Sequence, residues 1–162
     1  KEFNSISGID YSENAISKIK KNMNGNFIVA DAGSLPFEDN LFNKIICFSV
    51  FFYFSSLDYA EKVLNEMIRV CKPGGKILIG DINDAQKKGL YNSVRIKENR
   101  NKNHISKDNS LMHLFFEKMF FIEIAKKNKI KVQIINEDEL DLSYYSNAQY
   151  RFTVVYTLPS KS

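Results

Sequence analysis

The stretch GIDYS at residues 8–12 places Asp10 directly after a short apolar run and directly before Ser12. The serine hydroxyl can cap a following helix, so the stretch predicts the end of a strand and the start of a helix. A second apolar run, 27–30, also ends in an acid, Asp31. Ligands of open α/β sheets bind outside the carboxyl ends of the strands, so both acids are expected at one sheet edge. There, one acid can accept hydrogen bonds from ribose hydroxyls and the other from an adenine amine.

Apolar runs and helical periodicities alternate along the rest of the chain. Strands are expected at 6–10, 27–30, 44–50, 76–82, 130–135 and 152–158, and helices after Ser12 and at 58–71, 90–96 and 111–127. This alternation predicts an α/β fold: a doubly wound, mainly parallel sheet with helices on both faces. The last two strands have no helix between them, so we expect an antiparallel C-terminal strand.

Size and composition are those of one globular domain spanning 1–162, with a net charge of +4. That charge is too small to indicate a nucleic-acid partner. Cys47 and Cys71 lie in apolar patterns and are interpreted as buried free thiols of a cytoplasmic protein. With two His residues and no Cys cluster, no metal site is predicted. The run 45–54 is too short for a membrane span, which needs about 20 apolar residues.

The segment 84–109 is polar, rich in lysine and weakly periodic. It is interpreted as an insertion that could serve as a substrate lid, since its basic residues could attract an anionic acceptor, although the sequence favours the alternative. The alternative is a solvated loop that lysine keeps soluble. The basic residues in question are Lys87, Lys88, Arg95, Lys97, Arg100, Lys102 and Lys107.

Three segments together resemble the class I S-adenosylmethionine-dependent methyltransferases of the small-molecule type. They are GIDYSENAI at 8–16, ADAGSLPFEDNLFNKIICFSVFFYF at 30–54 and LNEMIRVCKPGGKILIGD at 64–81. The resemblance implies a Rossmann-like fold and S-adenosylmethionine as methyl donor, with S-adenosylhomocysteine as product. It also implies an in-line methyl transfer to a small-molecule acceptor.

The same resemblance implies a set of donor-binding residues. Asp10 would hold the ribose diol and Tyr11 would pack on the adenine. Asp31 would face the adenine amine, and the Ala32 N–H a ring nitrogen. The methionine portion would be lined by Phe48, Ser49 and Val50.

The chain departs from the family pattern at two places. Asn43 stands where the family usually has an acid, and no G-x-G turn or preceding strand comes before the GIDYS stretch. In the family that first strand is central to the sheet. We therefore expect an N-terminally truncated methyltransferase domain that belongs to a longer product, or one that receives a strand from another segment or from a second copy in a homo-oligomer.

Four further residues are candidates for the acceptor side: Tyr53, Asp81, His104 and His113. Each also has a structural interpretation, since Tyr53 can pack among phenylalanines, Asp81 can cap a turn, and a lone His is more often structural than catalytic. Asp10 could likewise serve only the helix dipole, and Asp31 could be a loop acid. No catalytic base is predicted, because methyl transfer from a sulfonium needs one only when the nucleophile must lose a proton.

Three functions compete on this evidence. The first is methyl transfer to a small molecule. The second is a non-catalytic methyltransferase-like scaffold that has lost the Gly-rich turn. A nucleic-acid methyltransferase is the third, but the Asn/Asp-Pro-Pro-aromatic motif of amine-methylating forms is absent at 48–51.

Overall fold

The computed structural model describes residues 5–101, 113–142 and 144–160. Its strands are β1 (Ser7–Asp10), β2 (Asn26–Val29), β3 (Phe42–Phe48), β4 (Cys71–Asn83), β5 (Lys131–Asn136) and β6 (Arg151–Thr157). Its α-helices are α1 (Glu13–Asn22), α2 (Leu57–Val70), α3 (Lys88–Asn101) and α4 (Lys118–Lys127). Short 3-10 helices are η1 (Phe51–Tyr53), η2 (Ala85–Lys87), η3 (Glu137–Glu139) and η4 (Ser146–Tyr150).

Within the described residues the strands form two sheets. β1 and β2 make a parallel pair, and a four-stranded sheet has the order β3-β4-β6-β5. β3 and β4 are parallel, whereas β6 runs antiparallel to both β4 and β5. The expected antiparallel C-terminal strand is therefore confirmed, and the architecture is a mixed α/β sheet.

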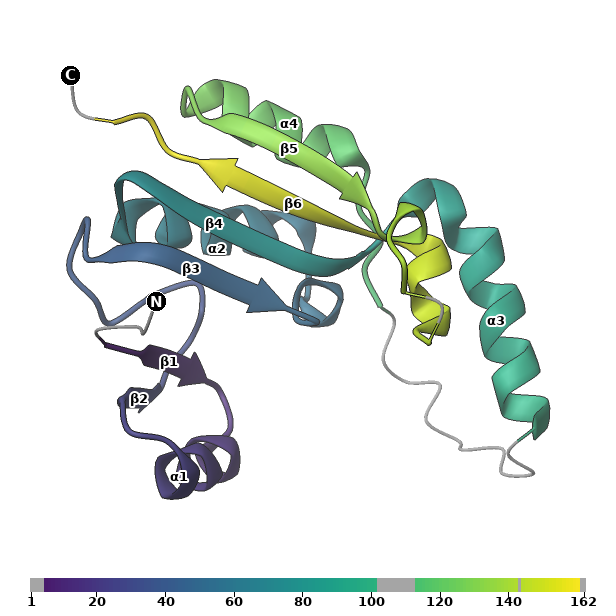
Figure 1. Ribbon diagram of the computed structural model, residues 1–162, viewed down its shortest axis with the longest axis horizontal. Helices are drawn as coiled ribbons and strands as arrows, with labels where there is room; N and C mark the ends of the chain where they lie inside the picture. Colours follow the sequence, from purple (N-terminus) through teal and green to yellow (C-terminus); the bar gives the residue numbers. More distant parts are fainter. Residues whose placement is uncertain (1–4, 102–112, 143, 161–162) are drawn as a thin grey trace.

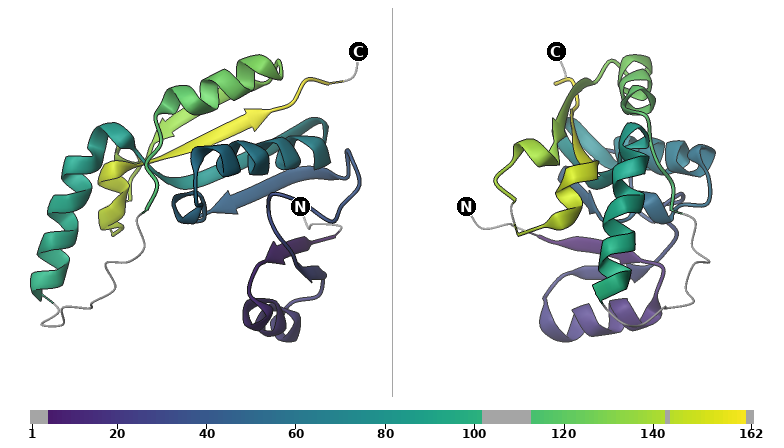
Figure 2. Two further views of the ribbon diagram at one scale, coloured as in Figure 1. Left: turned by 180° about the vertical axis from the view of Figure 1, so that it is seen from behind. Right: turned by 90° about the vertical axis from the view of Figure 1, so that its right-hand side faces the viewer.

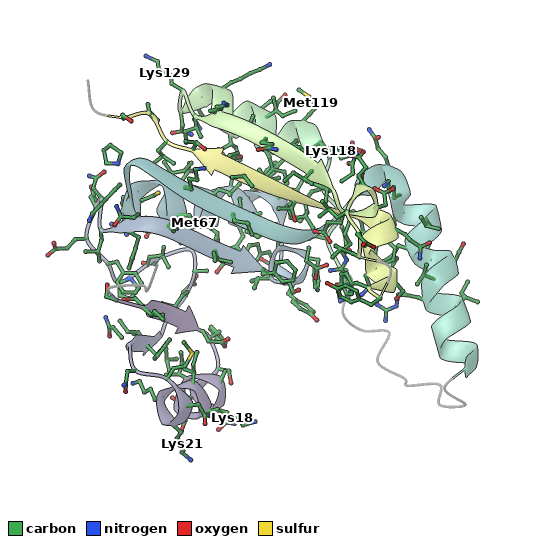
Figure 3. The ribbon with its side chains drawn as sticks, in the orientation of Figure 1. Lys18, Lys21, Met67, Lys118, Met119 and Lys129 are labelled. Atoms are coloured by element: carbon green, nitrogen blue, oxygen red, sulfur yellow. The ribbon has the colours of Figure 1, made fainter. Side chains whose placement is uncertain are left out.

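Helices α2 and α4 lie on the same face of the four-stranded sheet (Figures 1 and 2). The α2 helix begins where the Ser56 hydroxyl accepts the Tyr59 N–H, and its apolar stripe is buried. Met67 lies in this stripe between helix and sheet, while Lys18 and Lys21 of α1 point away from it (Figure 3). A single core between the two helices and the sheet follows from this packing; its fully buried members include Val63, Leu64, Ile77, Ile79, Phe121, Phe152, Val154 and Tyr156.

The opposite face of the sheet is open along β3. Ile46 and Phe48 point to this face and are 71% and 55% exposed, whereas Ile45 and Cys47, which alternate with them, pack on the core. Among the described residues, no helix covers β3 on the face opposite to α2 and α4 (Figure 2).

The β1-β2 pair lies beside the β3 edge of the larger sheet in both views (Figures 1 and 2). Among the described residues β1 pairs only with β2, and β3 pairs only with β4. Each therefore presents an unpaired backbone edge. A strand is missing between them in the part of the chain that the structure describes.

Two expected elements differ in extent. The helix predicted over 111–127 is wrong for 113–117, because this segment is extended and Phe116 bridges to Asp84 beyond the end of β4. The short helix predicted at 90–96 is the longer α3, which forms the first part of the 84–109 insertion. The remainder of the insertion, 102–109, lies outside the described residues.

Candidate functional site

Asp10 is the last residue of β1, and its side chain is exposed. Its Oδ1 accepts the backbone N–H of Ser12 at 2.7 Å, and the Ser12 hydroxyl in turn caps α1 by accepting the Ala15 N–H. One carboxylate oxygen is thereby oriented by the start of the helix. The neighbouring Tyr11 side chain is 87% exposed and lies on the same turn.

Asp31 follows β2 and is held by two donors. Its Oδ1 accepts the Gly33 N–H at 2.6 Å and the Tyr59 hydroxyl at 2.5 Å. These hydrogen bonds keep the pKa of Asp31 below its usual range, and the one from Tyr59 has the larger effect. Ala32, the next residue, packs against the core, so the Asp31 backbone is tied to the domain.

The parallel register of β1 and β2 brings the two acids to one edge. Asp10 is opposite Val29, and its carbonyl accepts the Ala30 N–H at 3.1 Å. Asp31 therefore leaves the sheet one residue after a segment that is bonded to Asp10. The structure thus places both carboxylates at the carboxyl ends of adjacent strands, as expected from the sequence.

An ionic network holds the loop that follows Asp31. Arg69 of α2 donates to the Glu66 carboxylate, to the carbonyls of Leu35 and Phe37, and to Asp39, over distances of 2.7 to 3.0 Å. Glu66 also accepts the Leu35 N–H at 2.7 Å. Arginine donates in a fixed fork, so one side chain fastens several points of the loop.

The segment after β3 turns sharply at the same end of the large sheet. Ser49 has a φ of +59°, a left-handed value, and its N–H donates to the Gly80 carbonyl at 3.2 Å. The Phe48 ring lies against the α-carbon of Gly80 on the open face. Val50 is 38% exposed. Phe48 and Val50 thus present apolar surface beside the unpaired edge of β3.

Asp81 is the centre of a buried polar cluster. Only 2% exposed, it also has a left-handed φ of +64°. Its Oδ2 accepts the Ser49 hydroxyl at 2.5 Å and an Arg151 Nη1 at 2.5 Å, and its Oδ1 accepts the Tyr145 hydroxyl at 2.7 Å. Since both of its oxygens accept hydrogen bonds within the protein, the Asp81 carboxylate holds its neighbours in position and does not face a substrate.

The side chains of His113 and Tyr53 are in contact beside η1, which follows β3. Their rings are perpendicular with centroids 5.2 Å apart, and the His113 ring also lies 5.0 Å from that of Phe52. The Tyr91 hydroxyl of α3 is 3.0 Å from His113 Nδ1. The other candidate histidine, His104, lies outside the described residues.

Five supporting residues were missed at the sequence level: Tyr59, Glu66, Arg69, Tyr145 and Arg151. They lie 28 to 70 residues from the groups that they hold. A weak signal was available for two of them, because Glu66 and Arg69 carry opposite charges three residues apart on α2.

Among the described residues, no helix is both long and apolar enough to cross a membrane. The same part of the chain holds no group of three or more His, Cys, Asp or Glu side chains suited to a metal ion.

A mixed α/β sheet with acids after two adjacent strands and an antiparallel final strand is similar to the fold of solved S-adenosylmethionine-dependent methyltransferases. Residues 1–79 match a family model described as "Methyltransferase domain". This match covers just under half of the chain, and the likeness to solved structures concerns the fold.

Curated relatives match about half of the chain. The ubiquinone/menaquinone biosynthesis C-methyltransferase UbiE of Desulfotalea psychrophila is 34% identical over 93 residues, which are 56% of this chain and 37% of that protein. A demethylmenaquinone methyltransferase of Desulfitobacterium hafniense is 37% identical over 84 residues, 48% of this chain and 32% of that protein. The chain thus spans only about a third of the length of these relatives.

Solved structures share the fold over almost the whole chain. A SAM-dependent methyltransferase of Methanosarcina mazei has a TM-score of 0.63 at 15% identity, covering 97% of this chain and 83% of that one. The N-methyltransferase NodS of Bradyrhizobium japonicum, in complex with S-adenosyl-L-homocysteine, has a TM-score of 0.63 at 14% identity, covering 96% and 67%.

Proposed function

We propose that this domain binds S-adenosylmethionine along the edge formed by Asp10 and Asp31 and transfers its methyl group to a small-molecule acceptor. The observation that carries the proposal is the juxtaposition of these two exposed carboxylates at the ends of paired parallel strands. Each has one oxygen oriented by the backbone and a second with no hydrogen-bond partner among the described residues. That second oxygen is available to a ligand.

In this proposal the donor is held by residues at the ends of β1 and β2 and by the segment that ends β3. Asp10 accepts from the ribose hydroxyls, Tyr11 packs on the adenine, and Asp31 and the Ala32 N–H face the adenine edge. Phe48, Ser49 and Val50 line the methionine portion. In the reaction the acceptor atom attacks the methyl carbon, the carbon–sulfur bond breaks, and its electron pair stays on sulfur as S-adenosylhomocysteine. Positioning by the protein supplies most of the catalysis, because the sulfonium is already activated.

The unpaired edges of β1 and β3 bear on how the methionine end is held. A further strand between them, from elsewhere in the polypeptide or from a second copy, would satisfy both rows of backbone groups. We include such a strand in the proposal. Native mass spectrometry tests it: a folded, monomeric protein of 18.7 kDa that binds S-adenosylhomocysteine with normal affinity would contradict it.

We infer that the acceptor side is formed by Tyr53, His113 and the described part of the insertion, 84–101. An anionic acceptor finds less free charge here than the sequence suggested, because Lys87 is paired with Asp138 at 2.7 Å. We propose a small molecule, not a nucleic acid, as the acceptor. Cytoplasmic location is part of the same proposal, and burial raises the pKa of the Cys47 thiol to about 12, which fits an unreactive free cysteine.

The competing function is a non-catalytic scaffold, which the unpaired edges of β1 and β3 favour. Calorimetric titration of the native-length protein with S-adenosylhomocysteine separates the two. Methyl transfer predicts binding that Asp10→Ala weakens by about 1–3 kcal/mol, the cost of a lost charged hydrogen bond. Absence of binding at millimolar ligand would favour the scaffold.

A further inference from the structure

The His113 side chain is partly exposed and is surrounded by aromatic and hydrogen-bonding groups, unlike a histidine packed in a core. Its ring is partly exposed and lies against Phe52 and Tyr53, at the carboxyl-end edge of the large sheet. The next residue, Leu114, fixes the backbone: its N–H donates to the Phe52 carbonyl at 2.9 Å, and its carbonyl accepts the Asn83 amide at 3.1 Å. The backbone next to the His113 ring is thus held by η1 and by β4. It lies beside the segment proposed to line the methyl donor.

A hydrogen-bonded chain reaches the Nδ1 side of this ring. Arg95 Nη1 donates to the Tyr91 hydroxyl oxygen at 2.6 Å, and that oxygen is 3.0 Å from His113 Nδ1. The Tyr91 side chain is buried, and Arg95 lies one helical turn further along α3. The Nε2 atom has no hydrogen-bond partner among the described residues and is not among their buried unsatisfied atoms. One nitrogen is therefore supported and the other is accessible.

We propose that His113 is the proton acceptor of the methyl transfer, and that Tyr91 and Arg95 are its positioning residues. This rests on the proposed function. His113 Nδ1–H donates to the Tyr91 oxygen, which leaves the Nε2 lone pair free. As the acceptor atom attacks the methyl carbon, its proton passes to Nε2, and the carbon–sulfur electron pair stays on sulfur. The acceptor class is accordingly a hydroxyl or an acidic carbon, which must lose a proton to react.

The charges around the His113 ring favour its neutral form, which a proton acceptor requires. Burial, Arg95 and Arg151 lower the pKa of His113, so the imidazole is neutral at physiological pH. Besides these two arginines, the titratable groups against the ring are Tyr91 from α3 and Tyr53 from η1. No carboxylate among the described residues is in hydrogen-bond contact with the ring. A neutral base beside cations releases its proton readily after each turnover.

The first experiment is 15N NMR of histidine-labelled native-length protein with S-adenosylhomocysteine bound, with His113→Asn used to assign the signal. We expect the tautomer that carries its proton on Nδ1, and a pKa below 6.5. Arg95→Gln is expected to raise that pKa, while Lys21→Gln, which removes the same charge from the distant helix α1, leaves it unchanged. A neutral tautomer with its proton on Nε2, or a pKa that Arg95→Gln does not move, would overturn the proposal.

The second experiment measures transfer of a labelled methyl group from S-adenosylmethionine into a small-molecule extract of the source cells. General base catalysis is worth about 10²–10⁴-fold, so His113→Asn should lower the rate of transfer into a fixed amount of extract by that order, with unchanged affinity for S-adenosylhomocysteine. Tyr91→Phe should shift the acid limb of the pH profile. Wild-type transfer that His113→Asn leaves intact contradicts this inference alone, whereas no transfer and no donor binding by the wild type contradicts the proposed function.

Discussion

The Tyr59 hydroxyl of helix α2 donates a 2.5 Å hydrogen bond to Asp31 Oδ1, joining the helix to the turn that follows β2. Gly33 donates to the same oxygen, and an alanine Cβ at position 33 would come within 3.0 Å of the Tyr59 ring. The carboxylate is thus pre-oriented before any ligand arrives. Pre-orientation lowers the ordering cost of binding, so under the proposed function this contact should strengthen donor binding.

Replacing Tyr59 with Phe should raise the pKa of Asp31, because a donor that favours the charged form is lost. Weaker binding of S-adenosylhomocysteine should accompany this change. NMR titration of the Asp31 carboxyl and calorimetry measure the two effects. Tyr144→Phe is the matched control, since that side chain is 84% exposed. Equal Asp31 pKa values in the Tyr59 variant and the control would contradict the interpretation.

Acid should weaken the clamp between Glu66 and Arg69. The hydrogen bonds of Arg69 lower the pKa of Glu66, so its stabilising effect is present above the unfolded value of about 4.3 and is lost as pH falls through the lower folded value. Glu66→Gln should lower the free energy of unfolding at neutral pH by about 1–3 kcal/mol. This difference from wild type should shrink toward acid pH in urea titrations.

Glu61→Gln is the control for that experiment. Glu61 lies on the same helix as Glu66, and among the described residues its ion pair is an exposed one with Lys127 of α4 at 3.3 Å. Exposed pairs contribute about 0–1 kcal/mol. A Glu66 variant as stable as this control at neutral pH would show that the clamp contributes nothing.

Gly80 is required by the close approach of the Phe48 ring. An alanine Cβ there would lie 2.7 Å from Phe48 Cε2, so the ring must move. Gly80→Ala should cost about 1–3 kcal/mol of unfolding free energy, as overpacking does, and should also weaken donor binding. Gly89→Ala in α3, where a Cβ meets nothing within 4 Å, should be neutral or stabilising by about 0.5–1 kcal/mol. Indistinguishable variants would rule out the packing argument.

The buried pair of Asp81 and Arg151 should be far more sensitive than a surface pair. Asp81→Asn leaves the guanidinium, only 5% exposed, without its charge partner. The expected loss is about 3–5 kcal/mol. Asp138→Asn, which breaks the more exposed pair with Lys87, should cost about 0–1 kcal/mol. Denaturant unfolding of both variants measures the contrast, and equal losses would contradict it.

Short-range sequence signals predicted the main elements of this fold because their causes are local. An apolar run marked β3 and a helical apolar pattern marked α2, and the strand ends located Asp10 and Asp31. The helix expected from residue 111 was partly wrong, since a pairing of Phe116 with Asp84 overrides the helical pattern. Tyr59, Tyr145 and Arg151 could not be found this way, because their partners lie on distant segments that only folding brings together.

The central claim is that the carboxylates of Asp10 and Asp31 hold one nucleoside between them. A crystal structure of the native-length protein with S-adenosylhomocysteine tests this most directly. We predict ribose hydroxyls within hydrogen-bond distance of Asp10 and the exocyclic adenine amine within that distance of Asp31. An adenosyl group bound elsewhere, with both carboxylates left in solvent, would contradict the account.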